Sequence, residues 1–168
     1  MTLKDEGEGS PSRLTQALLG TGGALVLLSL ALPWYVYNDQ GITVSVTGSS
    51  LFGVLPVLGL LVGCGVSLVL LGVALARPRA VARRDVESLM ARVAYTLAAL
   101  GSIAIPLLAA YLYSGQARSL YLVSFWDAAG MGWAVALVGG SLALLGAMSG
   151  WVLGGQSSAR PIGETAPG

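Results

Sequence analysis

Residues 51–76, LFGVLPVLGLLVGCGVSLVLLGVALA, contain no charged side chain. An α-helix rises about 1.5 Å per residue, so a helix of this length exceeds the roughly 30 Å thickness of a bilayer's hydrocarbon core. The apolar residues surround the helix on nearly all sides, which is typical of a helix that faces lipid. The stretch therefore predicts a helix that spans a membrane.

Three further stretches share this character and have a similar length: residues 15–34, 93–113 and 131–153. None carries Asp, Glu, Lys or Arg in its middle, so each is also expected to span the membrane. We therefore predict an all-α membrane protein in which residues 14–153 form an up-down bundle of four transmembrane helices. The flanking tails, residues 1–13 and 154–168, are rich in Gly, Ser, Pro and Glu and are predicted to be disordered.

The composition of the chain agrees with this class. Only 10% of the 168 residues are charged and 55% are hydrophobic, whereas a soluble domain carries about 25% charged residues. The net charge of +1 gives no attraction to nucleic acid. There is no histidine and only one cysteine, Cys64, which excludes histidine-ligated metals, histidine-based catalysis and an intramolecular disulfide. We therefore expect no enzyme activity, no metal and no cofactor.

The basic residues are distributed unevenly between the predicted loops. The link between the second and third helices carries Arg77, Arg79, Arg83 and Arg84, whereas the two other loops carry only Arg118. Cytoplasmic loops are enriched in Lys and Arg, so these four arginines are predicted to set the topology. The result is a multi-pass protein of the cell membrane with both termini in the cytoplasm.

Two alternatives to this topology argument remain open. The basic link has an alternative role as a patch that lies on anionic lipid. The first helix has an alternative role as a cleaved signal peptide, although its apolar stretch exceeds the roughly 7–15 residues of a signal's apolar region.

The first outer loop has the pattern of a β-hairpin. Residues 35–37 and 42–46 alternate as strands do, and NDQG between them, residues 38–41, consists of turn residues. We predict a small extracytoplasmic hairpin here. The second outer loop contains SLYLVSFW, residues 119–126, for which a third strand and an interfacial helix both remain open.

Aromatic residues gather near the outer ends of the predicted helices. Trp34, Tyr35, Tyr37 and Trp126 are candidates for contact with a partner outside the membrane. The alternative, which we favour, is an aromatic belt in which amphipathic rings lie at the depth of the lipid headgroups.

Glycines recur every four residues on two predicted helices: Gly59 and Gly63 on the second, and Gly146, Gly150 and Gly154 on the fourth. Small residues four apart share one face of a helix and let another backbone approach closely. Such a face either packs inside the bundle, which we favour, or binds another subunit.

Residues 31–63, ALPWYVYNDQGITVSVTGSSLFGVLPVLGLLVG, resemble a recurrent pattern in small four-helix membrane proteins of actinobacteria, in which the first helix also ends in a Leu-Pro-Trp-Tyr-like sequence. In layout the chain is similar to the tryptophan-associated transmembrane family. The resemblance extends to residues 127–147, implies the same fold and brings no catalytic residues. The arrangement is also similar to claudins, but their Gly-Leu-Trp motif and paired cysteines are absent here, so that likeness is one of shape.

These features predict a non-enzymatic membrane protein that acts by contact, as an accessory or scaffold subunit. Its expected partners are membrane lipid and other membrane proteins or further copies of itself. The alternative is an oligomeric transporter or pore for a small solute, for which kinks expected at Pro56 and Pro106 would be useful. An enzyme acting on lipid would need an acid or base at membrane depth, and the apolar stretches supply none.

Overall fold

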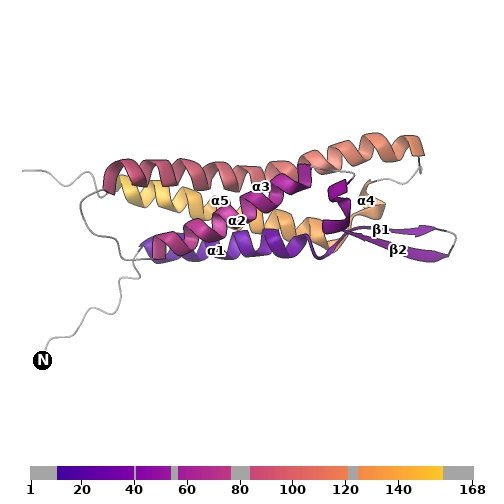
Figure 1. Ribbon diagram of the computed structural model, residues 1–168, viewed down its shortest axis with the longest axis horizontal. Helices are drawn as coiled ribbons and strands as arrows, with labels where there is room; N and C mark the ends of the chain where they lie inside the picture. The colour runs from indigo at the N-terminus through magenta and orange to yellow at the C-terminus, as the bar shows by residue number, and fades with distance from the viewer. Residues whose placement is uncertain (1–10, 40, 54–56, 77–83, 121–124, 157–168) are drawn as a thin grey trace, which may run out of the picture.

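The computed structural model describes residues 11–39, 41–53, 57–76, 84–120 and 125–156 (Figure 1). The elements follow in this order: α1 (Pro11–Ser29), β1 (Pro33–Asp39), β2 (Ile42–Thr47), the 3-10 helix η1 (Ser49–Gly53), α2 (Val57–Ala76), α3 (Arg84–Leu120), α4 (Phe125–Ala128) and α5 (Met131–Gln156). The described part of the chain is therefore mostly helical with one small antiparallel sheet, as the sequence predicts.

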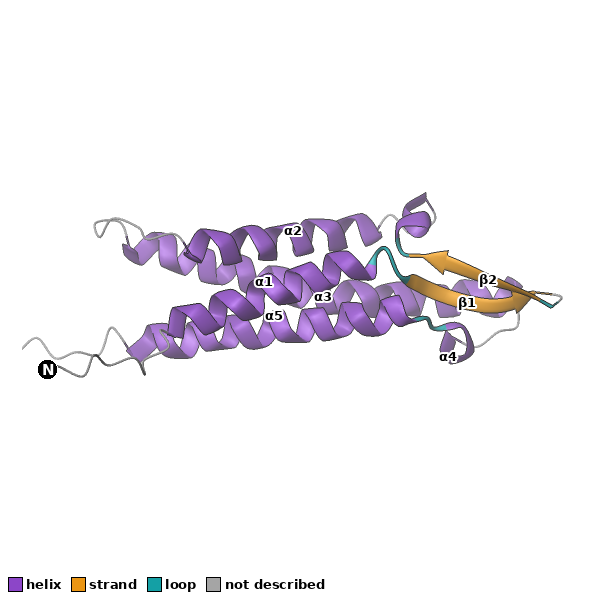
Figure 2. Ribbon diagram, turned by 90° about the horizontal axis from the view of Figure 1, so that it is seen from below, coloured by secondary structure: helices purple, strands orange, loops and turns teal. Residues whose placement is uncertain are grey.

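The long helices α1, α2, α3 and α5 lie side by side (Figures 1 and 2). α1 packs against α2 and α5, and α3 packs against the same two helices, so the contacts form a closed ring. One cluster of buried residues surrounds Trp34 and Leu61, and a second surrounds Leu19 and Tyr95. The two clusters fill the interior at opposite ends of the bundle.

Two helical segments within the described residues are long and apolar enough to cross a membrane. They are Leu89–Leu112 of α3 and Met131–Val152 of α5, with 24 and 22 residues. The apolar segment Leu58–Val73 of α2 is shorter. The prediction of four spans therefore stays a prediction.

The first helix ends earlier than the sequence predicts. Residues 15–34 are predicted to be helical, but α1 covers Pro11–Ser29 and Trp34 belongs to β1. The N–H groups of the three residues after Ser29 bond to carbonyl oxygens three residues earlier, which forms a tight turn. Pro33 has no N–H and cannot continue a helix. Hydropathy misses this end because the turn is as apolar as the helix before it.

Three other predicted helices have different bounds in the structure: 51–76 becomes Val57–Ala76, 93–113 becomes Arg84–Leu120, and 131–153 becomes Met131–Gln156. Apolar length marks only the part of a helix that suits a membrane, and polar helix formers extend α3 beyond it. η1 replaces the predicted start of α2, and the expected kink at Pro56 lies outside the described residues, whereas Pro106 lies inside α3.

The predicted disordered tails are helical where the structure describes them. Residues 11–13 belong to α1 and residues 154–156 belong to α5. The rest of both tails, residues 1–10 and 157–168, lies outside the described part of the chain.

The predicted hairpin is confirmed. β1 and β2 pair antiparallel, with Tyr37 opposite Val44 and Asp39 opposite Ile42. Gly41 at the tip has a φ of 87°, a left-handed conformation that glycine adopts without strain. Its N–H donates to the Oδ1 of Asn38 over 3.0 Å, which closes the turn. The hairpin extends beyond the ends of α1, α2 and α5, alongside the last part of α3 (Figures 1 and 2).

Candidate functional site

Trp34 fixes the hairpin to the end of the bundle. Its side chain is 0% exposed, and its indole N–H donates to the carbonyl oxygen of Ser29 over 2.8 Å. The Trp133 ring packs against it edge-on, with centroids 6.4 Å apart. A Cβ at Gly48 or Gly132 would lie 2.6 Å or 2.5 Å from the indole ring, so both positions need glycine. Strand, helix and turn therefore converge on one buried tryptophan.

Backbone hydrogen bonds complete this attachment. The N–H of Gly130 donates to the carbonyl oxygen of Trp34 over 2.8 Å. The N–H of Ser49 donates to the carbonyl oxygen of Leu30 over 2.9 Å. Tyr35, next to Trp34, forms an isolated bridge with Ala129 and is 1% exposed. These bonds join both ends of the hairpin to the bundle and hold its orientation.

The prediction that Trp34 and Tyr35 present a contact surface is therefore wrong, because both side chains are buried in the attachment. The two other predicted contact residues differ from them. Trp126 on α4 is 83% exposed, and Tyr37 on β1 is half-buried. These two, on the same end of the molecule, remain candidates for contact with a partner.

The helices cross at glycines. A Cβ at Gly22 of α1 would lie 2.6 Å from the carbonyl oxygen of Gly139 of α5, and a Cβ at Gly139 would lie 2.8 Å from that of Gly22. On the other side of α1, a Cβ at Gly23 would lie 2.9 Å from the carbonyl oxygen of Gly65 of α2. A Cβ at Gly140 of α5 would lie 3.1 Å from the carbonyl oxygen of Ser102 of α3. Such close backbone approach is how helices pack where hydrophobic force between them is weak.

The predicted glycine face of the last helix packs inside the bundle. A Cβ at Gly146 would lie 2.9 Å from the Cβ of Leu18 of α1, and a Cβ at Gly150 would meet the hydroxyl of Tyr95 of α3. The preferred interpretation, internal packing, therefore holds for both, and the alternative of a free partner face does not. Gly154 lies in α5, but its surroundings are outside the described residues.

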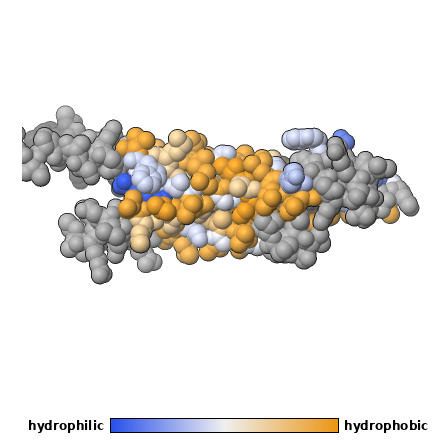
Figure 3. Space-filling model, turned by 90° about the horizontal axis from the view of Figure 1, so that it is seen from above, coloured by the Kyte–Doolittle hydropathy of each residue, from blue (hydrophilic) through white to orange (hydrophobic). Residues whose placement is uncertain are grey.

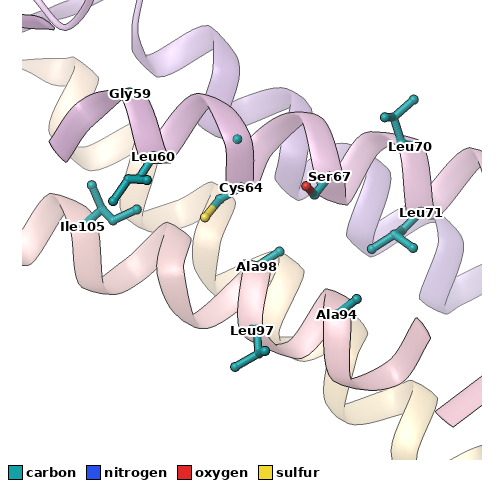
Figure 4. A pocket seen from close by; sticks show the side chains of 11 residues that line it. Gly59, Leu60, Cys64, Ser67, Leu70, Leu71, Ala94, Leu97, Ala98 and Ile105 are labelled. Carbon is teal, nitrogen blue, oxygen red and sulfur yellow. The ribbon is translucent and has the colours of Figure 1, made fainter. Parts of the chain in front are cut away.

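Gly59 and Gly63 behave differently, because both are exposed. A Cβ at either position would meet no described atom within 4 Å. Both line a groove of about 840 Å³ between α2 and α3. Figure 4 shows Cys64 of α2 and Ala98 of α3 facing each other across it. The predicted small-residue face of α2 is therefore part of a groove on the surface.

The groove opens onto an apolar exterior. Large hydrophobic side chains stand exposed beside it, including Leu60 and Leu70 of α2 and Leu97 of α3. The space-filling view shows hydrophobic residues over much of the visible face of the helices (Figure 3). The lining residues described by the structure carry no charged side chain.

The hydroxyl groups inside the bundle are used in packing. Ser29 and Ser102 donate to carbonyl oxygens of their own helices over 2.6 Å and 2.8 Å. The hydroxyls of Thr15 of α1 and Ser149 of α5 are bonded over 2.8 Å. These groups hold helices in place and do not converge on a cavity, and the described residues contain no cluster of three or more His, Cys, Asp or Glu suited to a metal ion.

A polar contact also joins α3 to α5. The indole N–H of Trp151 donates to the hydroxyl of Thr96 over 3.0 Å, and the guanidinium carbon of Arg92 lies 5.8 Å from the centre of the Trp151 ring. The predicted topology-setting residues Arg77, Arg79 and Arg83 lie outside the described part, and Arg84 is the first residue of α3. Their role stays a prediction.

Comparison with protein-family models, with curated proteins and with solved structures finds no match to this chain.

The four-residue spacing of glycines in the sequence does not identify the crossing glycines Gly22, Gly23 and Gly65. The available signal is the repeated Gly-Gly pair, at residues 22–23 and 139–140, whose first members meet in space.

Proposed function

We propose that this chain is a multi-pass membrane protein that acts by contact, as an accessory or scaffold subunit. Its contact surface is the outer end of the molecule, where the hairpin and α4 lie beyond the ends of α1, α2 and α5. The observation that carries this proposal is the attachment through buried Trp34, with its 2.8 Å bond to Ser29. A hairpin held in one orientation is suited to presenting a surface, because binding then costs little ordering of the loop.

Four spans are the arrangement that best explains the exterior. α1 and α2 have 19 and 20 residues, which correspond to about 28–30 Å of helix and match the hydrocarbon thickness. They lie alongside α3 and α5, which have the apolar length to cross a membrane. Exposed leucines such as Leu28, Leu70 and Leu145 occur on several helices, and a surface of this kind favours lipid over water.

The orientation follows from charge. The link between α2 and α3 carries Arg77, Arg79 and Arg83, and the positive-inside rule puts such a link in the cytoplasm. Because the hairpin joins α1 to α2 at the opposite end of the bundle, it then lies outside the cytoplasm (Figure 1).

Contact is favoured over transport by the filled interior. Leu19, Val26, Leu61 and Leu68 are fully buried between the helices. A polar solute crossing along the bundle axis would lose its hydration without new partners, at a cost of several kcal/mol (about 2–7 per polar group). Transport by an assembly of several copies has no specific observation in its favour.

Photocrosslinking in native membranes tests the proposal. Benzoylphenylalanine at position 126, on the exposed α4, is expected to give one discrete protein adduct. The matched control places the same group at position 28, an exposed apolar position of α1. Adducts that are absent at 126, or identical at both positions, would contradict a contact surface at the outer end.

A further inference from the structure

The groove between α2 and α3 has a closed floor and an open side. A Cβ at Gly101 of α3 would lie 2.7 Å from the Sγ of Cys64, so the two helices touch there. Beside this contact, Gly59 and Gly63 leave two positions of the α2 wall without a side chain. We propose that the groove binds one acyl chain of a membrane lipid. This inference rests on the membrane placement proposed above.

The dimensions suit an extended chain. Along α2 the lining runs from Gly59 to Leu71, and along α3 from Ala94 to Ile105. Twelve and eleven residue steps give a length of about 16–18 Å. The volume of about 840 Å³ falls within the roughly 300–1,000 Å³ typical of ligand sites. The α3 wall belongs to the apolar segment Leu89–Leu112, so the groove lies at hydrocarbon depth.

The chemistry of the lining selects an uncharged, apolar occupant. The described lining residues are Gly, Ala, Leu and Ile, with Cys64 and Ser67 as the polar exceptions. A charged or strongly polar ligand would lose its hydration here without a charged partner. A hydrocarbon chain leaves no hydration shell behind when it moves from the bilayer into the groove, because it exchanges contacts with other lipid chains for contacts with the groove walls.

The two tails of the chain offer no matching occupant. Residues 1–10 carry Lys4, Asp5, Glu6 and Glu8, and residues 157–168 carry charged residues and two prolines. Burying such segments in an uncharged groove would be costly.

A second copy is also a poor match. A twofold dimer through this face would place groove against groove. Two concave surfaces facing each other leave space unfilled, and packing in membranes depends on filling it. A single acyl chain can lie along the groove without this mismatch.

The experiment uses the full chain in phosphatidylcholine–phosphatidylglycerol vesicles that contain a phosphatidylcholine with a diazirine midway along one acyl chain. After illumination, labelled peptides are identified by mass spectrometry. We expect residues 59–71 and 94–105 to be labelled at least fivefold more than the lipid-facing part of α1. Gly63→Leu and Ser67→Leu, which each place a larger side chain in the groove, should remove this excess.

Gly20→Leu is the matched control, because a Cβ at Gly20 also meets no described atom within 4 Å and the position lies outside the groove. It should leave the labelling unchanged. A lowered unfolding midpoint would reveal a groove variant that misfolds. Because two groove variants are used, misfolding of one does not decide the result.

Three results would overturn the inference. Even labelling of all lipid-facing helices, unaffected by either groove variant, would show ordinary lipid contact only. Efficient Cys64–Cys64 linkage between copies by a short bismaleimide would show that a second copy covers the groove. Failure of the protein to float with vesicles in a density gradient would refute the membrane placement itself. The first two results would refute only lipid binding in the groove, so the two kinds of failure are distinguishable.

Discussion

Replacing Gly22 with alanine should weaken the bundle where α1 crosses α5. The new Cβ would lie 2.6 Å from the carbonyl oxygen of Gly139, 2.7 Å from the backbone nitrogen of Ala143 and 2.9 Å from its Cβ. None of these atoms can rotate away. The closest distance must grow to about 3.4 Å, the lower end of ordinary contact, so the two helices must separate.

The size of the effect follows from two opposing terms. Overpacking a well-packed interior costs about 1–3 kcal/mol, and here the clash involves backbone on both helices, which favours the upper part of that range. Alanine recovers up to about 1 kcal/mol of helix propensity relative to glycine. We therefore expect a net loss of about 2 kcal/mol in the free energy of unfolding.

Reversible unfolding in mixed detergent micelles, followed by circular dichroism, measures this loss. Gly20→Ala is the matched control on the same helix, since its Cβ meets no described atom within 4 Å. It should be neutral or slightly stabilising. Equal unfolding free energies for Gly22→Ala and Gly20→Ala would refute the reasoning that backbone contact at Gly22 closes the bundle.

Three further predictions use the same unfolding assay. Trp34→Phe removes the N–H that bonds to Ser29 and leaves space in the attachment, so it should cost about 1–3 kcal/mol; a neutral result would contradict the anchoring role. Gly150→Ala should cost less than Gly22→Ala, and Tyr95→Phe should relieve it, because the atom in the way is a side-chain hydroxyl. Trp126→Ala should change stability by less than about 0.5 kcal/mol, since the side chain is 83% exposed, and a larger loss would place it in the fold rather than on its surface.

The parts of the fold that depend on neighbours in the sequence are predictable. The turn residues 38–41 and the alternating residues beside them predict the hairpin, and β1 and β2 pair there. The predicted start of the last helix at residue 131 is the start of α5. Local turn chemistry and apolar length carry both predictions.

The parts that depend on long-range contacts are not predictable in this way. From the sequence alone, Trp34 is typical of an aromatic residue at a membrane interface. Its burial depends on Gly48 and Gly132, which are distant from it in sequence. The meeting of Gly22 with Gly139 also joins the first and last helices. A spacing of four residues identifies Gly59 and Gly146 equally. In the structure, Gly59 lines an open groove, whereas Gly146 packs against α1.

Site-directed labelling of cysteines tests the proposed membrane arrangement most directly. In a Cys64→Ser background, single cysteines are introduced at Thr43, which is exposed on the hairpin, and at Ser10 and Ser157 in the two tails. A membrane-impermeant maleimide should label Thr43→Cys in intact cells, and should label Ser10→Cys and Ser157→Cys only after permeabilisation. Labelling of either tail in intact cells, or protection of Thr43→Cys until permeabilisation, would contradict four spans with the hairpin outside.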